Sequence, residues 1–400
     1  MISVGIDVSK GKSTVCIMKP GSKILKPPFE INHTVDELES LVTLIKSFNE
    51  EVRVVLEDTG HYHLPVVAAL VENEFFVCCV NALRMKKFCS QSLRRAKTGK
   101  IDSIKIANFG LTYWSELTPT LPKGEIYQEL KLLARQYYQT VSLLVKAKVN
   151  LSNLLDQVMP EIQSVLKDNN SNSKLTDFIA CYLHYQNILG MGEENFTANY
   201  CAWAREKGYR LNERKAAQIF ALAQNGIPTL PNSVSTQIAV SEAANLIRSI
   251  TESRNTILAQ MQEFCKSLPE YFILKDMPCV GKTLAPRFIA EIGDVRRFKN
   301  KHSAIAYAGI DAPPFQSGNF SADERHISKR GNRYLRKTGF EIMKSIIQHK
   351  PSGDPVYEFI QKKRNEGKCG KESMIAGLNK FLRIYYGKVM ELYSMTSTSI

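Results

Sequence analysis

Apolar and polar residues alternate along several stretches in the first quarter of the chain, which is the period of a β-strand. The pattern of apolar residues predicts five strands, over residues 2–8, 13–19, 24–32, 52–57 and 75–80. The third contains an adjacent proline pair, so we expect it at an edge of the sheet. The fifth is apolar throughout, which is typical of a central strand. Helical spacing predicts helices over 34–48, opened by a capping box of Thr34 and Glu37, and over about 61–73.

Three strands joined by short turns, followed by alternating helices and strands, form the order of a ribonuclease H-like (RuvC-like) α/β domain. We expect this domain over residues 1–115. Two long helices follow, over 125–157 and 234–267, with apolar residues at spacings of three and four. This apolar stripe predicts a coiled-coil-type connector over 120–268, whose two long helices pair with each other or with those of a second copy. The inserted segment 161–232 has a mixed pattern.

The last part of the chain, residues 269–395, is predicted to be a mainly helical domain. Residues 277–298 (MPCVGKTLAPRFIAEIGDVRRF) resemble a helix-hairpin-helix, in which backbone amides at a helix start face a phosphate. A helix over 302–309 precedes a loop rich in glycine, proline and serine. A basic helix is then expected over 326–348, and a helical tail over 354–393.

Composition narrows the class of protein. Hydrophobic residues make up 44% of the 400 residues and charged residues 23%, which excludes wholesale disorder. Apolar runs are too short for a transmembrane helix, and the N-terminus lacks a secretory pattern, so we expect no membrane association. The nine cysteines form no C-x-x-C pair. They are predicted to be free thiols of a reducing compartment, the cytoplasm.

Charge points to the kind of partner. Lysine and arginine number 53 and acidic residues 39, a formal net charge of +14, which indicates an anionic partner, most often nucleic acid. Between residues 84 and 105, eight cations surround one acid, which suits a polyanion. These cations are Arg84, Lys86, Lys87, Arg94, Arg95, Lys97, Lys100 and Lys105. A second basic set consists of Arg325, Lys329, Arg330, Arg333 and Arg336.

Three acidic residues are candidates for a metal site. Asp7 lies inside the apolar first strand, Glu57 ends the fourth, and Asp102 begins a helix after the fifth. The first and fourth strands are neighbours in a ribonuclease H-like sheet, so both carboxylates can converge with Asp102. Hard oxygen ligands from separate elements suit Mg²⁺, and two such ions can activate the attacking and leaving oxygens of a phosphodiester. Taken singly, each acid could equally cap a turn or lie on the surface.

Ser317 lies in the Gly, Pro and Ser-rich loop, next to Gly318. A serine before glycine is commonly a turn residue. Nearby cations or a metal can also deprotonate a serine and stabilise a phosphorane, which makes Ser317 a candidate nucleophile. We expect Arg325, Lys329 and Arg333 on one helical face toward it.

Taken in order, these motifs resemble those of DEDD transposases of the IS110 insertion-sequence family, which are bridge-RNA-guided recombinases related to pilin-gene invertases. The blocks GIDVSK, LEDTGHY and KTGKIDSIKIA, which carry Asp7, Glu57 and Asp102, match the three N-terminal blocks. The blocks MPCVGKTLA, EIGDVRRF, AYAGI, QSG and ISKRGNRYLR follow in the order of the family's C-terminal domain.

The resemblance implies a RuvC-like domain that holds Mg²⁺ through four acids, and a C-terminal domain whose serine becomes transiently linked to DNA. Ser317 falls on that serine. It also implies a structured non-coding guide RNA that pairs with target and donor DNA. The protein would be a homo-oligomer, a dimer or a tetramer made of two dimers, in which one subunit's acids work with another's serine. It would act at the nucleoid, in the cytoplasm of a bacterium or archaeon.

One position departs from the family pattern. The family block reads K-T-D-K-x-D-A, whereas Gly99 stands here in place of the first of its two acids and only Asp102 remains. The loss should weaken one metal site unless Asp58, DNA or water completes it. On the strand, Asp58 should point away from Glu57.

Three other readings stay open. A RuvC-like junction nuclease would use the acids and water and would not need Ser317. An actin-like kinase would need a second phosphate loop, which the sequence does not contain. A catalytically weakened relative that only binds RNA or DNA would fit Gly99.

Overall fold

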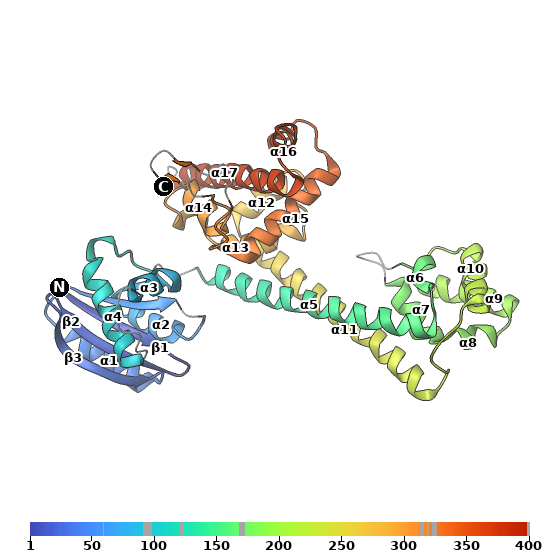
Figure 1. The fold of residues 1–400 in the computed structure, drawn as a ribbon, viewed down its shortest axis with the longest axis horizontal. Coiled ribbons are helices and arrows are strands. Elements are labelled where there is room, and N and C mark those ends of the chain that lie inside the picture. The colour runs from blue at the N-terminus through green and yellow to red at the C-terminus, as the bar shows by residue number, and fades with distance from the viewer. Residues whose placement is uncertain are drawn as a thin grey trace. The chain divides into compact units, whose positions relative to one another are not determined.

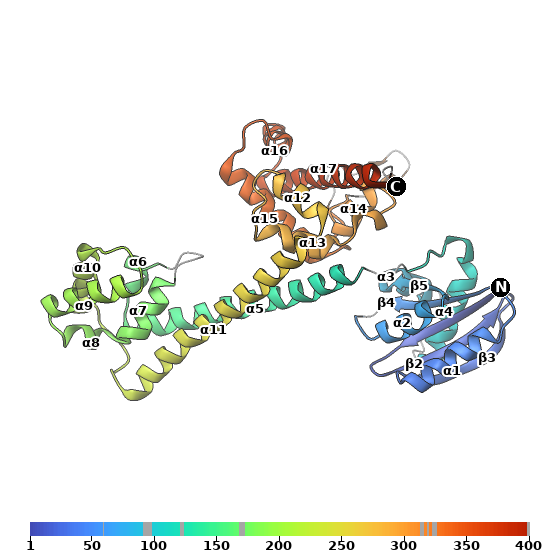
Figure 2. The same ribbon diagram turned by 180° about the vertical axis from the view of Figure 1, so that it is seen from behind.

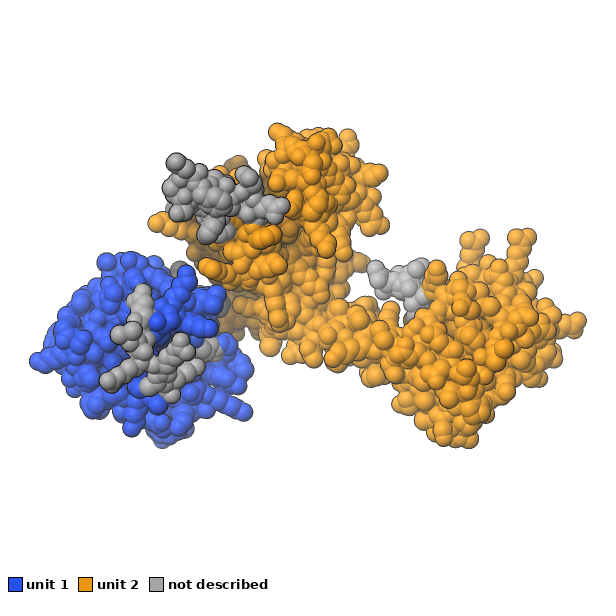
Figure 3. Space-filling model, viewed as in Figure 1, with its two compact units in different colours: residues 1–123 blue, residues 124–400 orange. Residues whose placement is uncertain are grey.

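The computed structural model describes residues 1–58, 60–90, 98–120, 124–167, 173–312, 316–317, 320–321 and 326–397. The chain divides into two compact units, residues 1–123 and 124–400 (Figure 3). The first unit carries a five-stranded sheet, and the second is built mainly of helices. All nine cysteines are free thiols. A search of the described part of the chain finds no helix with the length and hydropathy needed to cross a bilayer.

The sheet of the first unit has the strand order β3-β2-β1-β4-β5. Its strands are β1 (Ile2–Val8), β2 (Lys12–Lys19), β3 (Lys23–Asn32), β4 (Val52–Asp58) and β5 (Phe76–Asn81). β2 is antiparallel to both β1 and β3, whereas β4 runs parallel to β1, and β5 parallel to β4. This order with these directions is the ribonuclease H-like sheet, so the predicted fold class is confirmed.

β5 lies at an edge of the sheet, so its prediction as a central strand is wrong. The strand is apolar because it is covered on every side. Val77 faces one hydrophobic core, and Cys78 and Val80 face the other. The outer edge is covered by Thr120, whose amide donates to the Val77 carbonyl (2.7 Å) and whose hydroxyl accepts from the Cys79 amide (2.8 Å). Covering an edge in this way protects it from pairing with another chain.

Helices cover both faces of the sheet (Figures 1 and 2). They are α1 (Val35–Lys46), α2 (Leu64–Glu72), α3 (Ala82–Cys89) and α4 (Gly99–Thr112). Buried side chains of α1 and α2 share a core with the even-numbered residues of β1. Those of α3 and α4 pack on the opposite face, against β2, β4 and β5. The sheet is thus the middle of three layers, as its buried strands require.

The start of α1 differs from the predicted capping box. Thr34 occupies the N-cap position, but its side chain makes no capping hydrogen bond. The carboxylate of Glu37 instead accepts from the backbone amide and the side-chain amide of Asn32, both at 2.6 Å. Glu37 therefore ties the helix to the end of β3, so the capping-box prediction is wrong.

Helix α4 approaches β1 closely because glycines stand at the contacts. A Cβ atom on Gly5 would lie 2.2 Å from the Ala107 nitrogen and 2.4 Å from the Ser103 carbonyl oxygen. A Cβ atom on Gly110 would lie 2.2 Å from the Ser3 hydroxyl. The helix thus lies along β1 in the opposite direction, which brings its first residue to the end of the strand.

In the second unit, α5 (Glu125–Val158) and α11 (Val234–Cys265) are the two predicted long helices, and they pack side by side within the chain (Figures 1 and 2). Five helices between them form a cluster with its own aromatic core, which includes Phe178, Tyr182, Phe196 and Tyr200. These helices are α6 (Ile162–Val165), α7 (Lys174–Tyr182), α8 (Tyr185–Leu189), α9 (Glu193–Glu206) and α10 (Glu213–Asn225).

The rest of the second unit shares a core with the first turns of α5 and the last turns of α11. Its helices are α12 (Pro269–Asp276), α13 (Leu284–Ile292), α14 (Lys301–Ala308), α15 (Arg333–His349), α16 (Pro355–Asn365) and α17 (Gly370–Ser397). The short strands β6 (Gln316–Ser317) and β7 (Phe320–Ser321) pair between α14 and α15. α14 ends, as predicted, at Gly309, whose φ of +66° suits glycine.

The basic helix begins later than predicted. Asn332 caps α15, since its side chain accepts from the amides of Tyr334 and Leu335, and the first helical residue is Arg333. Lys329 lies before the helix with φ of +53°. The expectation that Arg325, Lys329 and Arg333 share a helical face is therefore wrong for Lys329, and Arg325 lies outside the described residues.

Candidate active site

Asp7 and Glu57 come together because β1 and β4 are parallel neighbours. The register pairs Ile6 with Leu56, so the next residue of each strand, Asp7 and Glu57, leaves the ladder side by side. Paired residues of parallel strands point to the same face. Here that face is the one covered by α4, because Gly5 on the same face contacts that helix. Both acids are half-buried.

The start of α4 meets these acids. A Cβ atom built on Gly99 would lie 3.2 Å from Oδ2 of Asp7 and 2.9 Å from Oγ1 of Thr14. Asp102 lies in the first turn of the same helix, which Thr98 caps by accepting from the Ile101 amide at 3.3 Å. Position 99 therefore faces Asp7 directly, and a carboxylate there would join the acids of the strands.

Glu57 and Asp102 both act electrostatically on the Cys89 thiol. Burial raises the pKa of the Cys89 thiol, and the charges of Asp102 and Glu57 raise it further, whereas Lys105 lowers it. The Cys89 thiol therefore lies within electrostatic range of Glu57, Asp102 and Lys105. Sequence reasoning missed Cys89 and Thr14. The pairing of Thr14 with Asp7 across the first hairpin could have indicated Thr14.

Asp58 does not replace the acid missing at Gly99. It follows Glu57 on β4, so it points to the other face of the sheet. Its Oδ1 lies 3.6 Å from Nε2 of His63, a buried residue at the start of α2.

The carboxylates suit a hard cation in kind but do not enclose one. Asp7, Glu57 and Asp102 offer oxygen ligands from separate elements beside the C-terminal ends of β1 and β4, which is the donor chemistry that Mg²⁺ prefers. Within the described residues, however, no three His, Cys, Asp or Glu side chains lie close enough together to hold a metal ion. Phosphate oxygens and water would therefore have to complete the coordination shell of a cation bound by these acids.

Ser317 lies in β6, and its backbone pairs with Phe320 of β7 in a small antiparallel hairpin. The base of this hairpin is closed by backbone hydrogen bonds from Ser328 to Asp311 (2.8 Å), from Lys329 to Gly309 (3.0 Å) and from Asn332 to Tyr307. The chain thus presents the serine on a short hairpin between two helices of the second unit.

Comparison with known proteins finds two family models that match separate parts of the chain. Residues 4–160 match the DEDD transposase family of IS110 elements, and residues 272–358 match the transposase family of IS116, IS110 and IS902 elements. Both matches are to transposase families and cover separate parts of the chain, called here the first and second transposase domains. Asp7, Glu57 and Asp102 fall in the first match, and the Ser317 hairpin falls in the second.

The relatives are distant but extensive. The chain is 22% identical over 299 residues to a protein of insertion element IS110 from Streptomyces coelicolor, covering 75% of this chain and 72% of the relative. It is 22% identical over 377 residues to a protein of insertion element IS116 from Streptomyces clavuligerus, covering 94% and 91%. A pilin gene-inverting protein of Moraxella bovis is 27% identical over 119 residues, covering 30% of this chain and 36% of that protein.

Among solved structures, the chain is similar to Thermus thermophilus RuvC in complex with a Holliday junction substrate. The similarity covers 30% of this chain and 99% of that chain, with 12% identity and a TM-score of 0.24. At this score it adds nothing to the fold assignment, which rests on strand order and direction.

The predicted basic residues of the first transposase domain differ in their surroundings. Arg84 pairs with Glu116 at 2.8 Å and lies over the rings of Phe109 and Tyr113, so it also has a packing role. Lys86, Lys87 and Lys100 are exposed, and Lys105 is half-buried. Arg94, Arg95 and Lys97 lie outside the described residues.

In the second transposase domain, Arg336 donates to the Ala308 carbonyl at 2.8 Å and is half-buried, which favours a structural role. Lys329, Arg330 and Arg333 are more open to solvent: Lys329 and Arg330 flank the hairpin base, and Arg333 contacts the hydroxyl of Tyr334 at 2.9 Å.

Proposed function

We propose that the protein is a DNA transposase, a site-specific recombinase of an insertion sequence that cuts and rejoins DNA strands. The observation that carries the proposal is that Asp7 and Glu57 meet the first turn of α4 at the C-terminal ends of β1 and β4. The same chain also matches a second transposase family over residues 272–358. The excess of positive charge supports a nucleic-acid substrate.

In this proposal Asp7, Glu57 and Asp102 would hold Mg²⁺ together with phosphate oxygens and water, because the side chains of the described residues alone do not enclose a cation. Bound there, the ions would stabilise negative charge on the oxygens around a reacting phosphorus. The chain's own contribution is to fix the carboxylates. Glycines at 5 and 110 allow α4 to lie on β1, so that Asp102 is held beside the ends of the strands.

The nucleophile in this proposal is Ser317. Its hydroxyl loses a proton and attacks a DNA phosphorus, so that a serine–phosphate ester forms and the bond to one strand end breaks, releasing a protonated DNA hydroxyl. A hydroxyl of another strand then attacks the ester, which rejoins DNA and restores Ser317. Exposed cations near the hairpin base, such as Lys329 and Arg330, would bind the phosphates.

We further propose that a structured non-coding RNA guides the protein to target and donor DNA, and that it works as a homo-oligomer in the cytoplasm, at the nucleoid. The order of elements supports the oligomer, because the long helices α5 and α11 separate the acids from the serine along the chain, so that acids of one copy could work with the serine of another. The RNA guide rests on the resemblance of the motifs to those of the family. Base pairing would read the sequence, whereas basic surfaces would bind the backbones.

The test compares Ser317→Ala with Ser321→Ala, a control in the partner strand of the same hairpin. Cells carry a plasmid with the gene and its native flanking DNA. The readouts are recombination junctions and DNA that stays bound to the protein after denaturation. We expect both signals to disappear in S317A and to persist in S321A. Adducts that survive in S317A would refute the serine, and cleavage without adducts would indicate a RuvC-like junction nuclease.

A second candidate function is favoured by Gly99, which leaves one acid missing beside Asp7. The protein would then bind RNA or DNA with little or no strand transfer. Asp7→Asn, with Asp58→Asn as the control, separates the two functions. If the wild type recombines DNA and only D7N fails, the transposase is supported. If the wild type binds nucleic acid but yields no junctions, the weakened relative is supported.

A further inference from the structure

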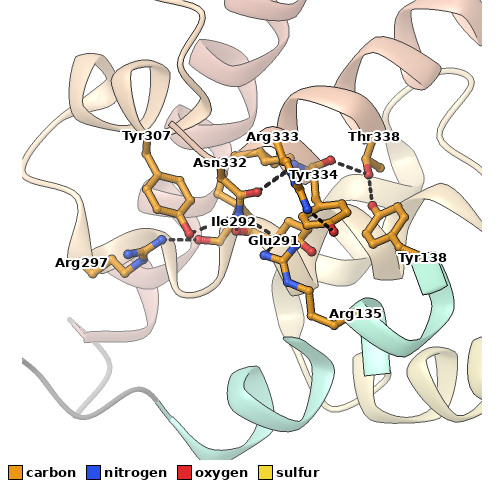
Figure 4. A network of polar contacts seen from close by, with 11 residues as sticks. Arg135, Tyr138, Glu291, Ile292, Arg297, Tyr307, Asn332, Arg333, Tyr334 and Thr338 are labelled. Carbon is orange, nitrogen blue, oxygen red and sulfur yellow. Dashed lines mark hydrogen bonds and ion pairs between the residues drawn. The ribbon is translucent and has the colours of Figure 1, made fainter. Parts of the chain in front are cut away.

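A buried carboxylate lies at the centre of a polar network in the second unit (Figure 4). Glu291 is the second-last residue of α13, and only 1% of its surface is exposed. Its Oε2 accepts from Nδ2 of Asn332 at 2.8 Å and from Nη2 of Arg135 at 3.0 Å. Buried carboxylates are rare, so a single one that joins three segments needs an explanation.

Asn332 connects Glu291 to the base of the Ser317 hairpin. Its backbone amide donates to the Tyr307 carbonyl, and its side chain caps α15. The adjacent Gly331 contacts the other side of the base so closely that a Cβ atom would lie 2.4 Å from the Gly309 nitrogen. The position of Asn332 therefore sets how the two arms of the hairpin meet α14 and α15.

Arg135 connects the same carboxylate to the long helix. It lies on α5, and its guanidinium stacks over the ring of Tyr334, the second residue of α15, at 3.9 Å from the ring centroid. One turn further along α5, Tyr138 stacks on Tyr334 at 4.6 Å and hydrogen-bonds Thr338 (Figure 4). The long helix and the hairpin base thus meet at Glu291.

The buried charge of Glu291 contributes little to the free energy of unfolding. Burial raises the pKa of Glu291, and the bond from Asn332 and the charges of Arg135, Lys131 and Arg287 only partly oppose that effect. Among the described residues, its Oε1 has no hydrogen-bond partner. A glutamine would keep an oxygen for Asn332 without a buried charge. Buried ion pairs of this kind often stabilise less than neutral groups of the same shape.

We propose that Glu291 is a positioning residue that couples helix α5 to the base of the hairpin carrying Ser317. The inference rests on the proposed function for its effect on DNA, but not for the coupling itself. By holding Asn332 and Arg135 at one oxygen, Glu291 fixes the start of α15 and the hydrogen-bonded base of the hairpin against α5. A change in the long helix would then reach the serine through this contact.

The test uses the full-length chain with Glu291→Gln and the matched control Glu341→Gln. Glu341 lies on α15 and pairs with the buried Arg287 at 2.8 Å, so the control breaks a neighbouring ion pair that does not contact Asn332. The readouts are hydrogen exchange at the amides of Ser328, Lys329 and Asn332, the midpoint of thermal unfolding, and the yield of denaturation-resistant protein–DNA adducts per folded molecule.

We expect E291Q not to lower the unfolding midpoint and to speed exchange at the three amides. Its adduct yield should fall about tenfold or more, since a misplacement of about 1 Å can cost about 10²-fold in rate. E341Q should lower the midpoint but change neither the exchange at the hairpin base nor the adduct yield. Arg135→Met should reproduce E291Q from the exposed side of the contact, and Arg135→Lys should recover part of the yield.

Three outcomes would overturn the inference: unchanged exchange at the hairpin base in E291Q, an adduct loss in E291Q that only follows its loss of folded protein, or an equal adduct loss in E341Q. If E291Q does not fold, R135M decides by the same readouts. Failure of the proposed function looks different, because adducts would then be absent from the wild type or survive in S317A, while exchange still reports the coupling.

Discussion

Gly99 faces the carboxylate of Asp7 at the point where helix α4 begins, and a Cβ atom at position 99 would lie 3.2 Å from Oδ2 of Asp7. The two residues come from elements far apart in sequence, joined by the close packing of α4 on β1. A side chain at position 99 would therefore enter the same space as the acids of β1 and β4. The chemistry of this space therefore depends on whether position 99 carries a carboxylate.

Replacing Gly99 with aspartate should strengthen cation binding. A fourth carboxylate beside Asp7 adds negative charge where a cation would sit, and we expect an affinity for Mg²⁺ at least about tenfold higher, ~1.4 kcal/mol. Thr14 must give way slightly, because its Oγ1 would lie 2.9 Å from the new Cβ atom, a contact that a change of side-chain rotamer relieves. Calorimetric titration with Mg²⁺ measures the affinity, and junction formation in cells should rise with it.

Gly99→Asn is the matched control, since it adds the same volume without the charge. It should bind Mg²⁺ like the wild type. In the presence of a chelator, G99D should also unfold at a lower temperature than G99N because two carboxylates repel each other, and added Mg²⁺ should reverse that order. Equal Mg²⁺ affinity in the two variants would show that position 99 does not face a cation.

Gly5→Ala tests how strongly the site depends on the packing of α4. The new methyl group would meet the backbone of α4 at 2.2 Å and 2.4 Å, and backbone atoms cannot move aside as a flexible side chain can. We expect a loss of ~1–3 kcal/mol in the free energy of unfolding, as for other overpacked cores. Chemical denaturation measures this loss. Gly387→Ala is the control, because it lies on the exposed face of α17 with nothing within 4 Å of the new carbon, and it should stabilise the protein by ~0.5–1 kcal/mol through helix propensity.

The sheet and the meeting of Asp7 with Glu57 could be predicted from the sequence because both follow from local periodicity and strand order. An acidic residue inside an apolar strand, as at Asp7, is conspicuous without any structure. The errors arose where a contact outside the local pattern took over, from 41 positions away at Cys79 and from five positions away at Glu37. Thr120 covers the edge of β5, so an apolar strand stands at the edge, and Asn32 takes Glu37 away from Thr34.

The network around Glu291 could not be predicted from the sequence. Arg135 and Glu291 are 156 positions apart, and neither residue stands in a pattern that indicates the other. The late start of α15 was partly foreseeable, because Asn332 after Gly331 is a good N-cap. The basic residues on both sides of Asn332 favour one continuous helix instead, so the sequence predicts a helix that starts at residue 326. What decides the contact is the packing of α5 on α13 and α15, which no local pattern encodes.

The ion pair between Arg287 and Glu341 should matter for stability in an asymmetric way. Arg287 has 7% of its side chain exposed and Glu341 has 33%, so Glu341→Gln leaves a buried charge without its partner. We expect a loss of ~3 kcal/mol in the free energy of unfolding, toward the low end for breaking a buried pair. The double variant Arg287→Met with Glu341→Gln should regain much of it, as chemical denaturation can show. A double variant that is less stable than E341Q would contradict this account.

Glu291 should make the stability of the second unit depend on pH. Its pKa is raised in the folded chain, so the folded state binds the proton more tightly than the unfolded state does. The stability that this preference provides is present below the unfolded pKa of about 4.3 and is lost as pH rises from there through the raised folded value. E291Q has no proton to lose, so its stability relative to the wild type should increase with pH across that window. Thermal unfolding of both proteins at a series of pH values measures the difference. A difference that stays constant with pH would mean that burial does not raise the pKa of this carboxyl group.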